Sequence, residues 1–154
     1  MWFTPKLKGS DAPAITNKYY VPRKVGGLSD CLRITTNSVL PNCVGYALGR
    51  FMEVQQLTKT KHPYQANGGQ IYRHTEDGYQ RGQIPQAGAL ICWDNPGYAG
   101  HVGFVEQVNS DGSIVVSQSG YRKGKLYDPS NNKGPSGDFW VDVIPKSSKG
   151  YIPK

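Results

Sequence analysis

The sequence contains the two residue types that together support nucleophilic catalysis on an acyl group, cysteine and histidine. Cys43 has the most informative position, because it follows Pro41-Asn42, a helix start signal, and precedes apolar residues at helical spacing over 44–51. A thiol in the first turn of a helix meets a partial positive charge that favours the thiolate, and backbone N–H groups that can hold a developing oxyanion. We therefore predict that Cys43 is the nucleophile, with a buried structural cysteine as the alternative.

A catalytic cysteine needs a base, and the chain offers three histidines. His62 precedes a proline in a polar stretch and His74 has charged neighbours, so we expect both to be solvated. His101 follows Gly100 at the start of a predicted strand, from which its side chain can reach the tip of the helix. His101 is therefore the predicted base.

A base histidine also needs a partner that orients its ring. Side chains alternate across a strand, so Glu106 is predicted to point away from the face that carries His101. On the next strand the partner depends on the register. A two-residue turn at 110–111 puts Gln118 diagonally opposite His101, whereas a bulge after the turn puts Ser119 there. Either side chain can accept the imidazole N–H, and neither carries a charge.

A helix followed by a sheet must position these residues. The pattern predicts one helix from about residue 43 to Leu57 and a second, short one over 67–75, where two glycines oppose it. Asn109-Ser110-Asp111-Gly112 is a hairpin signal between two strands. The predicted strands cover residues 89–93, 101–108, 113–119 and 139–144. This order predicts the α+β class, with N-terminal helices packed on an antiparallel sheet.

Composition limits the class of protein. A chain of 154 residues with 37% hydrophobic residues fits one globular domain, and 19 glycines with 11 prolines indicate many loops. No apolar run is long enough to span a membrane. The first residues lack the basic start and apolar core of a signal peptide, so we expect a cytoplasmic protein or one exported by another route. Three cysteines without zinc-site spacing predict neither a disulfide framework nor a metal site.

The net charge of +7 indicates an anionic partner, such as nucleic acid, an acidic lipid surface or an anionic wall polymer. Lysine and arginine are scattered singly and form no nucleic-acid motif. Nucleic acid is therefore the least favoured of the three partners, and no membrane insertion is predicted.

Four segments resemble, in order, the motifs of the CHAP family (cysteine, histidine-dependent amidohydrolase/peptidase). Residues 41–51, PNCVGYALGRF, resemble its cysteine motif, and residues 85–93, PQAGALICW, resemble its strand ending in tryptophan. Residues 100–106, GHVGFVE, are similar to its histidine strand, and residues 117–121, SQSGY, to its S-E-S-x-Y ending. The resemblance covers residues 41–121. It implies a papain-like α+β fold, with residues 31–145 as the catalytic domain, 1–30 as an N-terminal arm and 146–154 as a tail or linker.

The resemblance also implies roles for single residues. Cys43 corresponds to the nucleophile, His101 to the base, and Gln118 to the position where an acid usually orients the histidine. Because Gln118 can orient the ring but cannot neutralise an imidazolium, the third catalytic residue departs from the family pattern. Some members carry an acidic calcium loop before the cysteine, but residues 33–40 contain no carboxylate, so neither calcium nor another cofactor is predicted. The predicted substrate contacts are Asn42, Trp93, Tyr72 and Ser119.

The family implies hydrolysis of peptidoglycan, at the N-acetylmuramoyl–L-alanine amide or at a stem or cross-bridge peptide bond. Small size, positive charge and the missing signal peptide resemble phage endolysins, which act on Gram-positive walls and their anionic polymers. Such an enzyme is expected in the host cytoplasm before lysis, or in the virion. The alternative is a wall-binding module with little or no turnover, which the substitution at Gln118 favours.

Overall fold

The computed structural model describes residues 2–13, 17, 19, 43–57, 63, 66–94, 100–119, 139–148 and 150–151. Its main elements are helix α1 (Cys43–Gln55) and strands β1 (Leu90–Trp93), β2 (His101–Val108), β3 (Ile114–Ser119) and β4 (Phe139–Ile144). Three short 3₁₀ helices complete it: η1 (Gly9–Asp11), η2 (Gly68–Arg73) and η3 (Thr75–Asp77). The four predicted strands and the first predicted helix are confirmed, with shifts of one or two residues at their ends.

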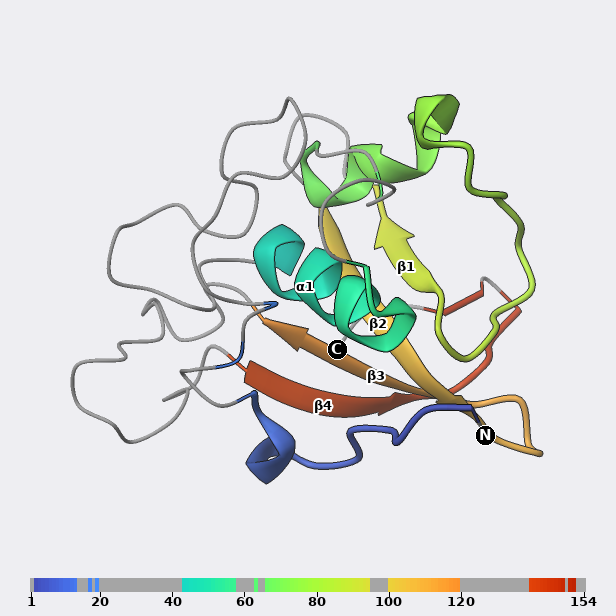
Figure 1. The fold of residues 1–154 in the computed structure, drawn as a ribbon. Coiled ribbons are helices and arrows are strands. Elements are labelled where there is room, and N and C mark those ends of the chain that lie inside the picture. Colours follow the sequence, from blue (N-terminus) through green and yellow to red (C-terminus); the bar gives the residue numbers. More distant parts are fainter. Residues whose placement is uncertain are drawn as a thin grey trace.

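The strands form one antiparallel sheet in the order β1-β2-β3-β4, and α1 lies across one face of it, over β2 and β3 (Figure 1). Residues 44–52 of α1 are all buried, so this helix forms the centre of the core and not a surface layer. Its apolar residues pack with Val102 of β2 and Ile71 of η2. One helix on an antiparallel sheet confirms the α+β class.

The second predicted helix, over 67–75, is instead the pair η2 and η3. Gly68 and Gly69 explain the difference, because both are buried against the start of β2. A Cβ on Gly68 would lie 2.8 Å from the backbone of His101, and one on Gly69 would lie 2.7 Å from the carbonyl oxygen of Trp93. The glycines allow a tight turn to reach the sheet at van der Waals distance, where an α-helix with side chains would not fit.

The β2–β3 hairpin contains two irregularities that compensate for each other. Its turn closes with Gly112 at φ +87°, and Val108 pairs with Ile114, as in the longer of the two predicted turns. Continued to the start of β2, that register would place Ser119 on the face that carries His101. A bulge between Val105 and Gln107 then shifts the pairing by one residue, so that Phe104 pairs with Ser117. Beyond the bulge, Gln118 takes the place that the shorter turn would have given it.

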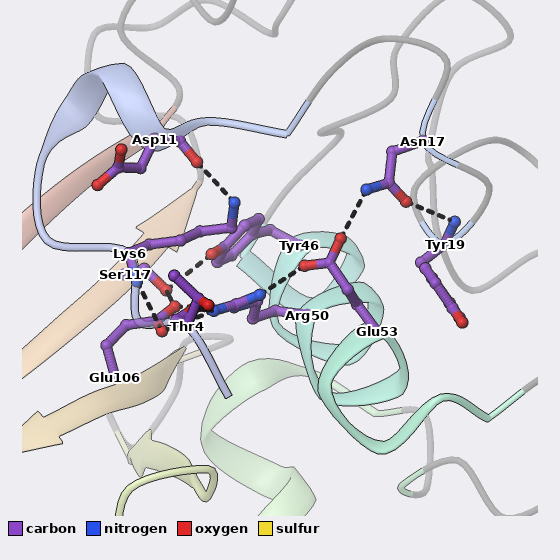
Figure 2. A network of polar contacts seen from close by, with 10 residues as sticks. All are labelled: Thr4, Lys6, Asp11, Asn17, Tyr19, Tyr46, Arg50, Glu53, Glu106 and Ser117. Carbon is purple, nitrogen blue, oxygen red and sulfur yellow. Dashed lines mark hydrogen bonds and ion pairs between the residues drawn. The ribbon is translucent and has the colours of Figure 1, made fainter. Parts of the chain in front are cut away.

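The bulge residue, Glu106, is fully buried against Arg50 of α1. Its side chain points away from the face that carries His101, as predicted. Figure 2 shows its carboxylate facing the Arg50 guanidinium, which donates two hydrogen bonds of 2.9 Å to it. The Ser117 hydroxyl donates a third at 2.7 Å, and Tyr46 in turn donates to the Ser117 hydroxyl at 2.7 Å. Every charge buried here has a direct partner, as burial in a low dielectric requires.

Both ends of the chain that the structure describes are attached to this domain. The Lys6 backbone N–H donates to Glu106 at 3.0 Å, and Arg50 also donates to the Thr4 carbonyl at 2.8 Å (Figure 2). At the other end, the Tyr151 hydroxyl donates to the Gly112 carbonyl at 2.6 Å. Within the described residues, no helix combines the length and apolar character needed to cross a membrane.

Candidate active site

Cys43 is the first residue of α1, and its thiol is partly buried between the helix and the start of β2. The backbone N–H of Val102, the residue after His101, interacts with the sulfur, as do the N–H groups of Cys43 and Val44. These three donors lower the pKa of the thiol, but burial outweighs them and raises it above its ordinary value of 9.0. The N–H groups at the helix terminus thus favour the thiolate, as expected, but burial of the thiol has the larger and opposite effect on its pKa.

Cys92 is a second free thiol in the same apolar cluster. Burial raises its pKa further, to about 11, although the Tyr72 backbone N–H and Arg81 oppose the shift. A thiol that holds its proton so firmly is a poor nucleophile near neutral pH. The local environment therefore favours Cys43 over Cys92 as the reactive group.

His101 begins β2, and its side chain lies on the sheet face opposite the buried Glu106. Its Nε2 lies 2.7 Å from Oε1 of Gln118. The ring is nearly parallel to two indoles, Trp93 at 5.5 Å and Trp140 at 6.1 Å between centroids. Burial lowers the pKa of His101 below its ordinary value of 6.5, and the hydrogen bond with Gln118 and the charge of Asp142 oppose that shift. The imidazole is therefore neutral at pH 7.

The structure brings together some of the predicted residues and not others. Gln118, and not Ser119, contacts His101, because the bulge resets the hairpin register. The side chain of Ser119 is completely buried, and its hydroxyl has no hydrogen-bond partner among the described residues. Asn42 lies outside the described residues.

Trp93 and Tyr72 line a cavity of about 650 Å³ beside β1. Tyr72 is exposed, and its hydroxyl accepts a hydrogen bond of 3.0 Å from Gln83. Neither Cys43 nor His101 lines this cavity, but Trp93 both lines it and stacks on His101. The cavity is therefore connected to His101 through the Trp93 indole. Arg73 and Asp94 form an ion pair at its edge.

Two residues near the histidine were missed by the sequence analysis, Trp140 and Asp142 of β4. Asp142 Oδ2 accepts one hydrogen bond from the Gln118 amide and one from the Trp140 indole, both of 3.0 Å. The signal was present in the sequence, because alternation along the predicted strand 139–144 puts residues 140 and 142 on one face. Only the pairing of β4 beside β3, with Trp140 opposite Gln118, shows which face that is.

Comparison with known proteins adds a family. A family model described as CHAP domain matches residues 34–120, more than half of the chain. The N-acetylmuramoyl-L-alanine amidase sle1 of Staphylococcus epidermidis is 55% identical over 42 residues, which are 27% of this chain and 13% of the relative. The protein of that name from Staphylococcus aureus is 51% identical over 45 residues, 29% of this chain and 13% of the relative.

A third relative, the Staphylococcus aureus protein named “Probable autolysin SsaALP”, is 46% identical over 48 residues, 31% of this chain and 18% of the relative. The matched segments thus span less than a fifth of the length of these three relatives. No solved structure gives a significant match.

Proposed function

Because this chain belongs to the CHAP domain family, we propose that it hydrolyses an amide or peptide bond of bacterial peptidoglycan by cysteine–histidine catalysis. The observation that carries the proposal is the position of Cys43. Its thiol lies at the N-terminus of α1 and contacts the backbone N–H of Val102, the residue after His101. Gln118 in turn contacts the His101 ring. The names of the relatives, two amidases and one autolysin from staphylococci, support this substrate class.

In the proposed reaction, the Cys43 sulfur attacks the carbonyl carbon of the scissile bond while its proton moves to His101. The carbonyl oxygen becomes an oxyanion, and the N–H groups at the start of α1 are the candidate donors that stabilise it. His101 then gives the proton to the leaving amine, the C–N bond breaks and a thioester remains. Water, deprotonated by His101, attacks the thioester carbon, and the thiol leaves with the return of the proton.

The pKa shifts of the two groups favour a neutral pair at rest. The pKa of Cys43 is raised and that of His101 is lowered, so at pH 7 both the thiol and the imidazole are uncharged. A neutral imidazole is the form that can accept a proton. We infer that the proton moves during the attack on the substrate and not before it.

The finer parts of the proposal follow from the resemblance and from charge. We favour the N-acetylmuramoyl–L-alanine amide over a stem or cross-bridge peptide bond, because two of the relatives are named for that amidase activity. The net charge of +7 suits the anionic polymers of Gram-positive walls. A phage endolysin, which waits in the host cytoplasm until lysis, fits these features. The papain-like arrangement is part of the same proposal.

Loss of turbidity of purified Gram-positive walls tests the proposal. We expect the wild type and Cys92→Ala to clear the walls, and Cys43→Ala to have no activity. Both variants remove one thiol, but only Cys43 is the proposed nucleophile, so Cys92→Ala is the matched control. Mass spectrometry of the released ends then identifies the bond. New L-alanine amino termini on intact muropeptide stems indicate the amidase reaction, whereas ends within the stem or cross-bridge indicate a peptidase.

Two outcomes would contradict the proposal. Full clearance by Cys43→Ala would exclude Cys43 as the nucleophile. Binding of wild-type protein to walls without clearance would indicate a wall-binding module. Circular dichroism of each variant checks that the fold is intact.

A further inference from the structure

The carboxylate of Asp142 ends a chain of contacts that begins at the candidate base. His101 contacts Gln118 at 2.7 Å, Gln118 donates to Asp142 at 3.0 Å, and the Trp140 indole donates to the same carboxylate oxygen at 3.0 Å. Asp142 lies two residues from Trp140 on β4, which pairs opposite Gln118. Strands β2, β3 and β4 therefore each contribute one or two members of one polar chain on a single sheet face.

The carboxylate determines which way the Gln118 amide points. An ionised carboxylate only accepts hydrogen bonds, so the group that faces Asp142 must be the amide NH₂. The amide oxygen then faces His101 and accepts from it, which requires the proton of the neutral imidazole to be on Nε2. This tautomer leaves the lone pair on Nδ1 available to take a proton from a thiol.

Asp142 also supplies the charge that Gln118 lacks. The side chains that contact the His101 ring from β1, β3 and β4 are Trp93, Gln118 and Trp140, and none carries a charge. Cys43, from α1, is a neutral thiol at pH 7. Among the described residues, Asp142 is the one whose charge acts on His101. A negative charge at this position stabilises the imidazolium that forms during the reaction.

We propose that Asp142 is a positioning residue of this site, which acts on His101 through Gln118 by fixing its tautomer and by stabilising its protonated form. The effect of Asp142 on catalysis rests on the proposed function. Its effect on the tautomer and protonation of the His101 ring does not depend on the substrate. The carboxylate that orients the histidine therefore does not contact the ring, because the Gln118 amide lies between them.

Two substitutions separate the two effects. Asp142→Asn keeps an oxygen that accepts from Gln118 and Trp140 but removes the charge, and we expect kcat on wall fragments to fall about tenfold, at the low end for partners that orient a histidine. Asp142→Ala also frees the Gln118 amide to turn and present its NH₂ to the imidazole, so we expect a larger loss, of about 100-fold. Asp111→Asn, which removes an exposed carboxylate at the hairpin turn, is the matched control and should keep wild-type activity.

NMR titration of His101 gives a readout that a merely structural role would not change. The experiment uses Cys43→Ala protein, so that no thiol titrates nearby, and the loss of one signal in His101→Ala assigns the ring. Asp142→Asn should lower the pKa of His101, because the charge that opposes the burial effect is gone. Asp111→Asn should leave it unchanged. An unchanged His101 pKa in Asp142→Asn would overturn the inference, even in a protein without wall activity.

A double-mutant cycle tests whether Asp142 acts through Gln118. If it does, Asp142→Asn should cause little further loss of kcat in a Gln118→Ala background, because the bridging amide is already absent. A tenfold loss in both backgrounds would overturn the relay. Failure of the inference and failure of the proposed function are distinguishable, because the first leaves Cys43→Ala inactive and the wild type active, whereas the second leaves the wild type inactive.

Discussion

Two polar clusters use the same pair of strands for opposite purposes. On the α1 face, Glu106 of β2 and Ser117 of β3 belong to a cluster in which the buried carboxylate meets Arg50 directly. On the other face, His101 of β2 and Gln118 of β3 belong to a cluster in which the carboxylate, Asp142, is one residue removed from the imidazole. The two clusters are adjacent in sequence, since Ser117 and Gln118 are neighbours on one strand.

The comparison shows how the pairing of charges separates stability from chemistry. Arg50 and Glu106 neutralise each other at 2.9 Å, so each charge compensates for the burial of the other. The neutral amide of Gln118 lies between His101 and the Asp142 carboxylate. This amide orients the imidazole ring without holding it in the charged form. The first arrangement ties α1, β2 and the N-terminal segment together, whereas the second leaves one imidazole nitrogen available as a base.

The largest expected effect follows from removing one charge of the ion pair between Arg50 and Glu106. Arg50→Met keeps much of the side-chain bulk but leaves the fully buried Glu106 without the cation that it contacts directly. We expect the free energy of unfolding to fall by about 3–5 kcal/mol, as for other buried ion pairs that lose one partner. Urea denaturation followed by circular dichroism measures the change.

The matched control for this prediction is the double variant Arg50→Met with Glu106→Gln. It removes both charges, so part of the lost stability should return. If the double variant is no more stable than Arg50→Met alone, the loss comes from packing around Arg50 and not from the unpaired carboxylate.

A change in the indirect cluster should affect activity and leave stability nearly unchanged. Gln118→Ala removes the group that orients His101, and we expect wall hydrolysis to fall roughly 100-fold, or about 2.7 kcal/mol in activation free energy. Steady-state clearance rates beside urea denaturation measure both quantities. A Gln118→Ala protein with wild-type rates would show that the ring is oriented by its two indole neighbours alone.

The smallest expected effect is the response to pH. Because the pKa of His101 is lowered, its neutral form prevails from below pH 6.5 upward, so activity should fall only when the pH drops below that value. Because the pKa of Cys43 is raised, its alkylation by iodoacetamide should accelerate as the pH rises toward and beyond 9. An alkylation rate that is high and constant down to pH 5 would instead indicate a resting thiolate–imidazolium pair.

Much of this architecture could be predicted because it depends on local patterns. The apolar spacing after Cys43 indicated α1, and short apolar segments between turn residues indicated the four strands. The direction of Glu106 also followed from alternation along one strand. These features involve residues close together in the sequence, where helix and strand periods apply directly.

The rest depends on contacts between distant segments. The choice between Gln118 and Ser119 required the bulge at Glu106, which forms where that residue meets Arg50, 56 positions earlier. The role of Asp142 required the pairing of β4 with β3 across residues 120–138. The protonation of Cys43 depended on burial, which the helix position alone does not indicate. In each case tertiary packing supplied information that the local sequence does not contain.

The paired irregularities of the hairpin have a consequence for how this chain can tolerate insertions and deletions. A surface turn such as 109–113 is a place where gain or loss of one residue normally costs little. Here a change that shifts the register by one residue would leave the sheet intact but turn Gln118 to the other face, and one of its neighbours would take its place beside His101. A length change in the turn is therefore compatible with function only when a second one, near Glu106, cancels it.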